Sequence, residues 1–280
     1  MSDVYSPPQP RPAKPEDLEP AEYSRISPQQ RVERATQILE GKGTINDLLR
    51  WNDSAWRLPH SIHDAAVRFS DKLLEELEEQ NDEFATYKHY SRLPVTQDIT
   101  QAREKLIDET ADTIWCSVAL AQASGASLFG ADFDISTPIA DFDFWIERAE
   151  TVDDGGEPGL LLLPYEIGTK SSEEQRLENF DNALKLAAIS SSAHAKHAID
   201  DIFGSEAYFR GFPNQPVQYE VSDEQAEYVR HQLQSVLAVS FRRLQLWLPN
   251  VTPAAVVVHL VGKIEQRIVD DAIDNKENRE

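Results

Sequence analysis

The sequence predicts an all-α fold, and three observations support this prediction. Apolar residues recur at helical spacing, for example at Phe69, Leu73 and Leu77, and this spacing forms one stripe along a helix. No stretch alternates apolar and polar residues for long enough to require a strand. Hydrophobic residues make up 40% of the 280 positions, so the chain can bury a core in one large helical domain or two smaller ones.

The predicted elements begin with a polar leader and two helices. Residues 1–28 hold seven of the sixteen prolines, a composition typical of a disordered segment. A first helix is expected from about residue 28 to residue 40, and Gly41-Lys42-Gly43 ends it. A short helix through Trp51 follows.

Two longer helices come next. Ser61-Ile62-His63-Asp64 resembles a capping box with Asp in the place of Glu, and it opens a helix that ends near Glu83 or Tyr87. A loop over residues 90–97 leads into a second long helix, over residues 100–124.

The second half of the chain is also expected to be helical. Residues 151–172 include an Asp-Asp-Gly-Gly run and are predicted to form a linker. The linker separates a first half, residues 29–150, from a second half, residues 173–280. Three further helices are expected over residues 172–203, 222–248 and 254–273.

Composition limits the classes of function. The chain has 27 basic and 49 acidic residues, a net charge of −22, which argues against nonspecific binding to nucleic acid or to anionic membranes. A nucleotide ligand stays open, because a bound metal ion can reverse the field inside a site. The single cysteine, Cys116, excludes an internal disulfide and a cysteine zinc site, and its apolar surroundings predict a core position.

The sequence also predicts no membrane partner. The longest uncharged run, residues 113–131, contains serines, a glutamine and glycines, so a buried helix with its exit turn is favoured over a membrane span. The N-terminus lacks the apolar segment of a secretory signal. We therefore expect a cytoplasmic protein.

Two acidic segments carry most of the functional information. Glu76 with Glu79, and Glu109 with Asp112, are each spaced i, i+3, which puts both carboxylates of a pair on one helix face. An acidic run alone usually means a solvated face. However, nineteen uncharged residues follow Asp112, and an ionised group at the mouth of a core is costly unless it is paired or coordinated. The combination predicts a Mg²⁺ site, with Mn²⁺ as the alternative.

These segments resemble the motifs of one family. Glu75-Glu76-Leu77-Glu78-Glu79 matches the pattern EExxE, and Glu109-Thr110-Ala111-Asp112 matches ExxD. Lys72-Leu73-Leu74 leads into the first motif, and an apolar helix continues from the second. In these features residues 62–130 resemble the MazG-like all-α nucleoside triphosphate pyrophosphohydrolases, which include dimeric dUTPases and dCTP pyrophosphatases.

The resemblance implies a MazG-like helical bundle that hydrolyses an NTP or dNTP to the monophosphate and pyrophosphate with Mg²⁺. It implies that Glu76, Glu79, Glu109 and Asp112 bind the metal and that Glu75 supports them. Glu76 or Glu79 would receive the proton of the attacking water. Two other interpretations stay open: a non-catalytic helical interaction protein, and an enzyme like the phosphoribosyl-ATP pyrophosphohydrolases.

The chain also departs from the family pattern. The segment from Gln80 to Asp108 is long, and basic residues expected soon after the second motif are missing from 125–150. Residues 182–197 and 232–248 can be laid over the two motif helices, and they then carry no carboxylate at the metal-binding positions. We therefore hypothesise a tandem of one active and one degenerate repeat, which would form either an intramolecular pseudo-dimer or, with a second chain, a homodimer.

Several residues are candidates for binding the nucleotide substrate. Basic side chains could contact phosphates and tryptophans could stack on a base, although such residues are more often ordinary surface or core residues. The closing helix, which contains Lys263 and Arg267, resembles the Lys/Arg-bearing tail of the family. The candidate substrate-binding residues are Lys72, Lys88, Arg92, Trp56, Lys263 and Arg267.

Overall fold

The described part of the chain is mostly helical. The computed structural model describes residues 27–55, 62–93, 96–126, 128, 134–141, 172–203 and 221–277. Within these residues there is no strand, only an isolated bridge between Thr44 and Pro138. The helices are α1 (Pro28–Leu39), α2 (Ile45–Ala55), α3 (Ile62–Ser91), α4 (Thr96–Ala123), the 3-10 turn η2 (Ile139–Asp141), α6 (Glu173–Phe203), α8 (Asp223–Trp247) and α9 (Pro253–Glu277). The predicted all-α class is confirmed, whereas residues 1–26 of the leader and 151–171 of the linker lie outside the described residues.

Local sequence signals set the helix ends. Ser27 caps α1 and Ser222 caps α8, each in a capping box with the glutamine three residues later. Gly41 follows α1 with φ of 72°, a backbone conformation that glycine adopts without strain. The two motif helices are longer than predicted, because α3 continues to Ser91 and α4 already begins at Thr96.

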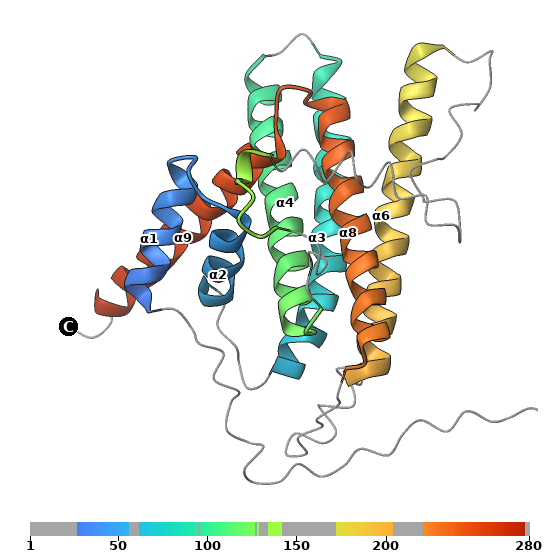
Figure 1. Ribbon diagram of the computed structural model, residues 1–280. Coiled ribbons are helices and arrows are strands. Elements are labelled where there is room, and N and C mark those ends of the chain that lie inside the picture. Colours follow the sequence, from blue (N-terminus) through green and yellow to red (C-terminus); the bar gives the residue numbers. More distant parts are fainter. Residues whose placement is uncertain are drawn as a thin grey trace, which may run out of the picture.

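Helices α3, α4, α6 and α8 form a four-helix bundle (Figure 1). Helix α3 packs on α4 and α6 packs on α8, and the two hairpins meet through α3 against α6 and α4 against α8. Ion pairs of α3 with α6 join Lys88 to Asp181 near one end and Asp71 to Lys196 near the other, so these two helices run antiparallel. The two halves therefore pack along their helices, as the tandem hypothesis requires, while the repeat itself stays a prediction.

The remaining helices lie on one side of the bundle. Helix α9 crosses α4, and α1 packs on both α2 and α9 (Figure 1). Glu265 on α9 accepts a hydrogen bond from the indole of the fully buried Trp51 at 2.8 Å and pairs with Arg31 at 3.0 Å. Cys116 is buried in the core, as predicted. This arrangement brings the last helix of the chain beside the second motif helix.

Candidate metal centre

The register between α3 and α4 brings the two acidic motifs together. Gln80 donates a hydrogen bond of 3.0 Å to the Thr110 hydroxyl, and both side chains are buried. Glu76 lies one turn before Gln80 on α3, and one of its carboxylate oxygens comes within 4.8 Å of an oxygen of Asp112 on α4. On α3 the apolar stripe of Leu73 and Leu77 is fully buried and carries Glu76 inward with it.

Three carboxylates converge in this position. One oxygen atom from each of Glu76, Glu109 and Asp112 lies within 4.8 Å of the others. The side chains of Glu76 and Asp112 are 6% and 12% exposed. The Glu76 Oε2 and Asp112 Oδ1 atoms are buried and have no hydrogen-bond partner among the described residues. Buried carboxylate oxygens without a donor are costly, and a cation between the three side chains would satisfy them.

Each of the two most buried carboxylates already pairs with a lysine through one oxygen. Lys72 Nζ lies 2.9 Å from Glu76 Oε1 on the same helix, and Lys263 Nζ from α9 lies 2.7 Å from Asp112 Oδ2. The oxygens without partners are the other atoms of these carboxylates, Oε2 and Oδ1. The lysines therefore neutralise part of the charge without occupying every oxygen that could coordinate an ion.

A second contact between α4 and α9 lies beside the centre. His259 Nε2 lies 2.6 Å from Asp108 Oδ1, and Lys263 Nζ lies 3.4 Å from the same carboxylate. Sequence reasoning missed Asp108 and His259. The available signal was their spacing, since His259 and Lys263 on α9 match Asp108 and Asp112 on α4, each pair at i, i+4.

The electrostatics follow from burial and from the crowded charges. Burial and the charge of Asp112 raise the pKa of Glu109 to about 7. Burial also raises the pKa of Glu76, and the hydrogen bond from Lys72 only partly opposes this. For Asp108, burial raises the pKa, but the contacts with His259 and Lys263 outweigh burial and lower it overall. The centre thus holds its negative charge at a cost, as expected for a site that a cation would complete.

The other predicted acidic ligands lie at the edge of this group. Glu79 is exposed and is not one of the three converging carboxylates. Burial is the main cause of the raised pKa values of Glu76 and Glu109, and the negative charge of Glu79 adds to both. Glu79 therefore lies near the two carboxylates. Glu75 is exposed and accepts a hydrogen bond of 3.2 Å from Lys72. Three of the five predicted ligands are therefore brought together, and the i, i+3 partner of Glu76 is not among them.

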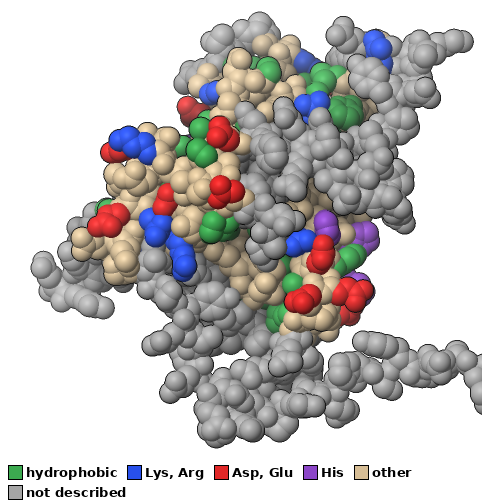
Figure 2. All heavy atoms as spheres, viewed as in Figure 1, with side chains coloured by type: hydrophobic (Ala, Val, Ile, Leu, Met, Phe, Trp, Pro, Cys, Tyr) green, Lys and Arg blue, Asp and Glu red, His purple; other side chains and the backbone are tan. Residues whose placement is uncertain are grey.

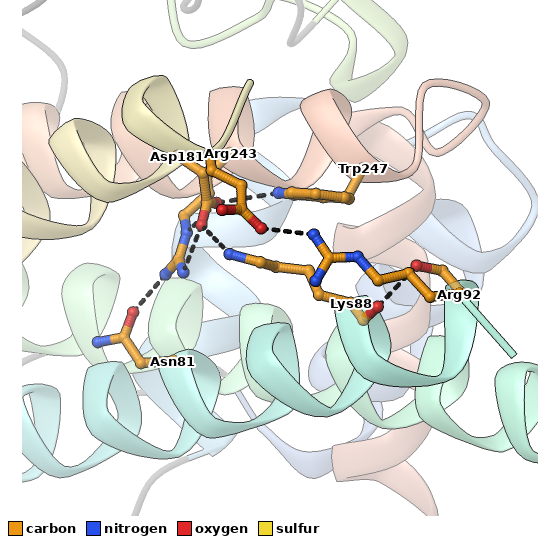
Figure 3. A network of polar contacts seen from close by, with 8 residues as sticks. Asn81, Lys88, Arg92, Asp181, Arg243 and Trp247 are labelled. Carbon is orange, nitrogen blue, oxygen red and sulfur yellow. Dashed lines mark hydrogen bonds and ion pairs between the residues drawn. The ribbon is translucent and has the colours of Figure 1, made fainter. Parts of the chain in front are cut away.

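Two of the predicted substrate-binding residues belong to a different network. Lys88 lies twelve residues beyond Glu76, about 18 Å along a helix axis. Its ammonium pairs at 2.9 Å with Asp181, whose carboxylate also binds Arg243. Arg92 pairs with Glu178 of α6 (Figure 3). Their charges join α3 to α6 and are not directed to the metal centre, because neighbouring acids on α6 satisfy them.

Of the other substrate candidates, Lys72 and Lys263 contact the centre. Arg267 lies one turn beyond Lys263, is exposed, and makes no ion pair with a described residue. Trp56 lies outside the described residues.

Figure 2 shows acidic and basic side chains interspersed among the described residues of one face. Among the described helices, none is long and apolar enough to cross a membrane.

The donor set favours a hard divalent cation. Three carboxylates without a cysteine or histidine in the group suit Mg²⁺ or Mn²⁺, and such ions complete their shells with water or phosphate oxygens. Comparison with models of protein families, with curated proteins and with solved structures finds no match to this chain. The residues of the candidate centre are therefore the only indication of function in the described part of the chain.

Proposed function

We propose that the protein is a Mg²⁺-dependent nucleoside triphosphate pyrophosphohydrolase that acts on an NTP or dNTP. The observation that carries this proposal is the convergence of Glu76, Glu109 and Asp112, in which two buried carboxylate oxygens find no partner among the residues that the structure describes. The motif spacing on α3 and α4, and the two lysines beside the carboxylates, support it.

The reaction breaks one phosphoanhydride bond. The oxygen of a water molecule attacks the α-phosphorus, the bond from that phosphorus to the oxygen bridging to the β-phosphorus breaks, and pyrophosphate leaves with the electron pair. Bound Mg²⁺ would neutralise charge on the phosphates and lower the pKa of the attacking water. Glu76, Glu109 and Asp112 would hold the ion, while Lys72 and Lys263 supply positive charge beside the phosphates.

Glu79 is suited to accept the proton of the attacking water. It stands one turn from Glu76 on the same helix, is exposed, and lies outside the three converging carboxylates. A base must be free to change its protonation state during the cycle, and a metal ligand is less free to do so. In this proposal Glu76 is a ligand and Glu79 is the base.

Pyrophosphate release from a panel of NTPs and dNTPs, with and without Mg²⁺, tests the proposal. Wild type is expected to release pyrophosphate only with Mg²⁺ or Mn²⁺. Asp112→Asn is expected to lower kcat/KM about a thousandfold because it removes a ligand charge. Glu79→Gln is expected to lower kcat about a hundredfold or more while Mn²⁺ affinity is retained.

Glu78→Gln is the matched control, because Glu78 lies on the same helix, is exposed and is outside the group. It should leave both turnover and metal affinity unchanged. Including phosphoribosyl-ATP in the panel identifies the alternative substrate class. If the folded wild type releases no pyrophosphate from any of these compounds, the proposed enzymatic activity is refuted and the non-catalytic interaction protein is favoured.

A further inference from the structure

Lys263 comes to the metal centre from far away in the sequence. Its ammonium pairs with Asp112, 151 residues earlier, at 2.7 Å, and its side chain is 14% exposed. It occupies Oδ2, and the buried Oδ1 of the same carboxylate has no partner in the described ranges of the chain. A tethered cation thus already stands beside the carboxylates that would receive a metal ion.

The neighbouring contacts give this ammonium an alternative partner. Asp108 lies 3.4 Å from Lys263 Nζ and also contacts His259 at 2.6 Å. Lys263 therefore lies between two acids of α4, and only Asp112 belongs to the converging group. If the Lys263 ammonium moved away from Asp112, it would still have a carboxylate partner, because Asp108 would remain within reach.

We propose that Lys263 is an exchangeable counter-cation: it pairs with Asp112 in the free protein and turns to the substrate's phosphates once a divalent cation binds the carboxylates. This inference rests on the proposed function for its second half, the transfer to phosphate. Its first half, competition between Lys263 and the ion, concerns the protein alone. As a consequence, the metal ion and the triphosphate should each increase the affinity of the protein for the other. The metal ion reduces the repulsion between the carboxylates and the phosphates, and the phosphates draw Lys263 away from the metal ion.

The sign of the effect distinguishes this role from simple packing. A lysine that only supports the shape of the centre would weaken metal binding when it is removed. A competing cation a few ångströms from the ion has the opposite effect, since its removal abolishes a repulsion between like charges. Removal of the same lysine should weaken nucleotide binding, because the phosphates lose a positive partner. The proposal therefore predicts changes of opposite sign in two affinities.

The first arm measures Mn²⁺ binding to the free protein by titration with electron paramagnetic resonance, without nucleotide. Lys263→Met keeps the aliphatic stem and is expected to tighten Mn²⁺ binding about tenfold. Lys263→Arg keeps the charge and should stay close to wild type. The matched control is Lys42→Met, because the Lys42 ammonium is exposed and pairs with Glu40 in the turn after α1; it should not change Mn²⁺ affinity.

The second arm measures binding of a non-hydrolysable nucleoside triphosphate analogue by calorimetry at saturating Mg²⁺. Lys263→Met is expected to weaken this binding about tenfold or more. Unchanged or weaker Mn²⁺ binding in Lys263→Met would overturn the competition, and unchanged analogue binding would overturn the transfer to phosphate. A wild type that binds Mn²⁺ but not the analogue would refute the proposed function and the transfer, while the first arm would still decide the competition.

Discussion

The bundle holds two groups of buried charge that differ in one respect. In the candidate metal centre, between α3 and α4, the Glu76 Oε2 and Asp112 Oδ1 atoms have no partner within the part of the chain that the structure describes. Between α3, α6 and α8, Asp181 is fully buried and accepts hydrogen bonds or ion pairs from Arg243, Lys88 and Trp247 (Figure 3).

The comparison indicates that the buried charge of Asp181 has a structural role, whereas the carboxylates of Glu76 and Glu109 belong to a candidate ligand site. The contacts of Asp181 outweigh burial, which alone would raise its pKa, and lower that pKa overall. At Glu76 and Glu109, burial and like charges raise the pKa instead. A buried acid whose donors are all supplied by the protein stabilises the packing of its helices, whereas one left short of donors can coordinate a ligand.

The largest expected effect on stability lies in the Asp181 network. Arg243→Met removes the guanidinium that binds Asp181 at 2.7 Å and also contacts Asn81 and the Phe84 ring. We expect a loss of about 3–5 kcal/mol in the free energy of unfolding, because a buried carboxylate loses its principal partner. Urea denaturation followed by circular dichroism measures this loss.

The control is on the same helix. Arg230→Met breaks an ion pair with Glu227, whose side chain is 57% exposed, and should cost less than about 1 kcal/mol. Equal losses in the two variants would contradict the distinction between the two kinds of charge.

A smaller effect is expected at Glu76. Its raised pKa means that folding disfavours the ionised form, so Glu76→Gln should change stability in EDTA by less than about 1 kcal/mol. Wild type should gain about 1.4 kcal/mol at a Mg²⁺ concentration ten times its Kd. Thermal unfolding with and without Mg²⁺ tests whether Glu76→Gln loses that gain. If the variant keeps it, Glu76 is not a ligand.

A further expected effect concerns the dependence of stability on pH. The pKa of Glu109 is raised to about 7 by burial and by Asp112, so between about pH 4.5 and 7 the folded protein binds more protons at this site than the unfolded chain. Stability contributed by Glu109 therefore falls as pH rises to about 7 and is constant above it. The difference in unfolding free energy between wild type and Glu109→Gln, measured in EDTA from pH 5 to 8, isolates this trend. A difference that does not vary with pH would contradict the raised pKa.

Metal binding should depend on pH in the opposite direction. The ion requires the ionised carboxylate, so Mn²⁺ affinity should rise towards pH 7 and then level off, and Glu109→Gln should flatten that rise.

Much of the fold was predictable because helix formation depends on local sequence. The apolar stripe through Leu73 and Leu77 identified α3, and the serines at 27 and 222 have the capping geometry expected of such residues before a helix. The predicted end of α3 and the predicted start of α4 were wrong by several positions, since the structure has them at residues 91 and 96. The boundary depends on the packing of α3 on α4 as well as on helix propensity.

The convergence of acidic side chains from α3 and α4 was predictable in outline, but which carboxylates converge was not. Glu76 lies beside the buried stripe and is drawn inward with it, whereas Glu79 lies further around the helix and remains exposed. The spacing of carboxylates on one helix cannot make this distinction, since it depends on which face the neighbouring helix covers. Lys88 and Arg92 looked equally suitable as phosphate ligands, and acids on α6 that are distant in sequence engage them instead.

The sequence by itself determined the all-α class of the described residues, and it placed Glu76 with Glu79, and Glu109 with Asp112, on one face of their helices, because helical periodicity is a local property. Only the tertiary structure decided which carboxylate oxygens remain without donors and that Lys263 and His259 meet α4. These contacts join residues more than a hundred positions apart, so they follow from the packing of helices and not from any pattern along the chain.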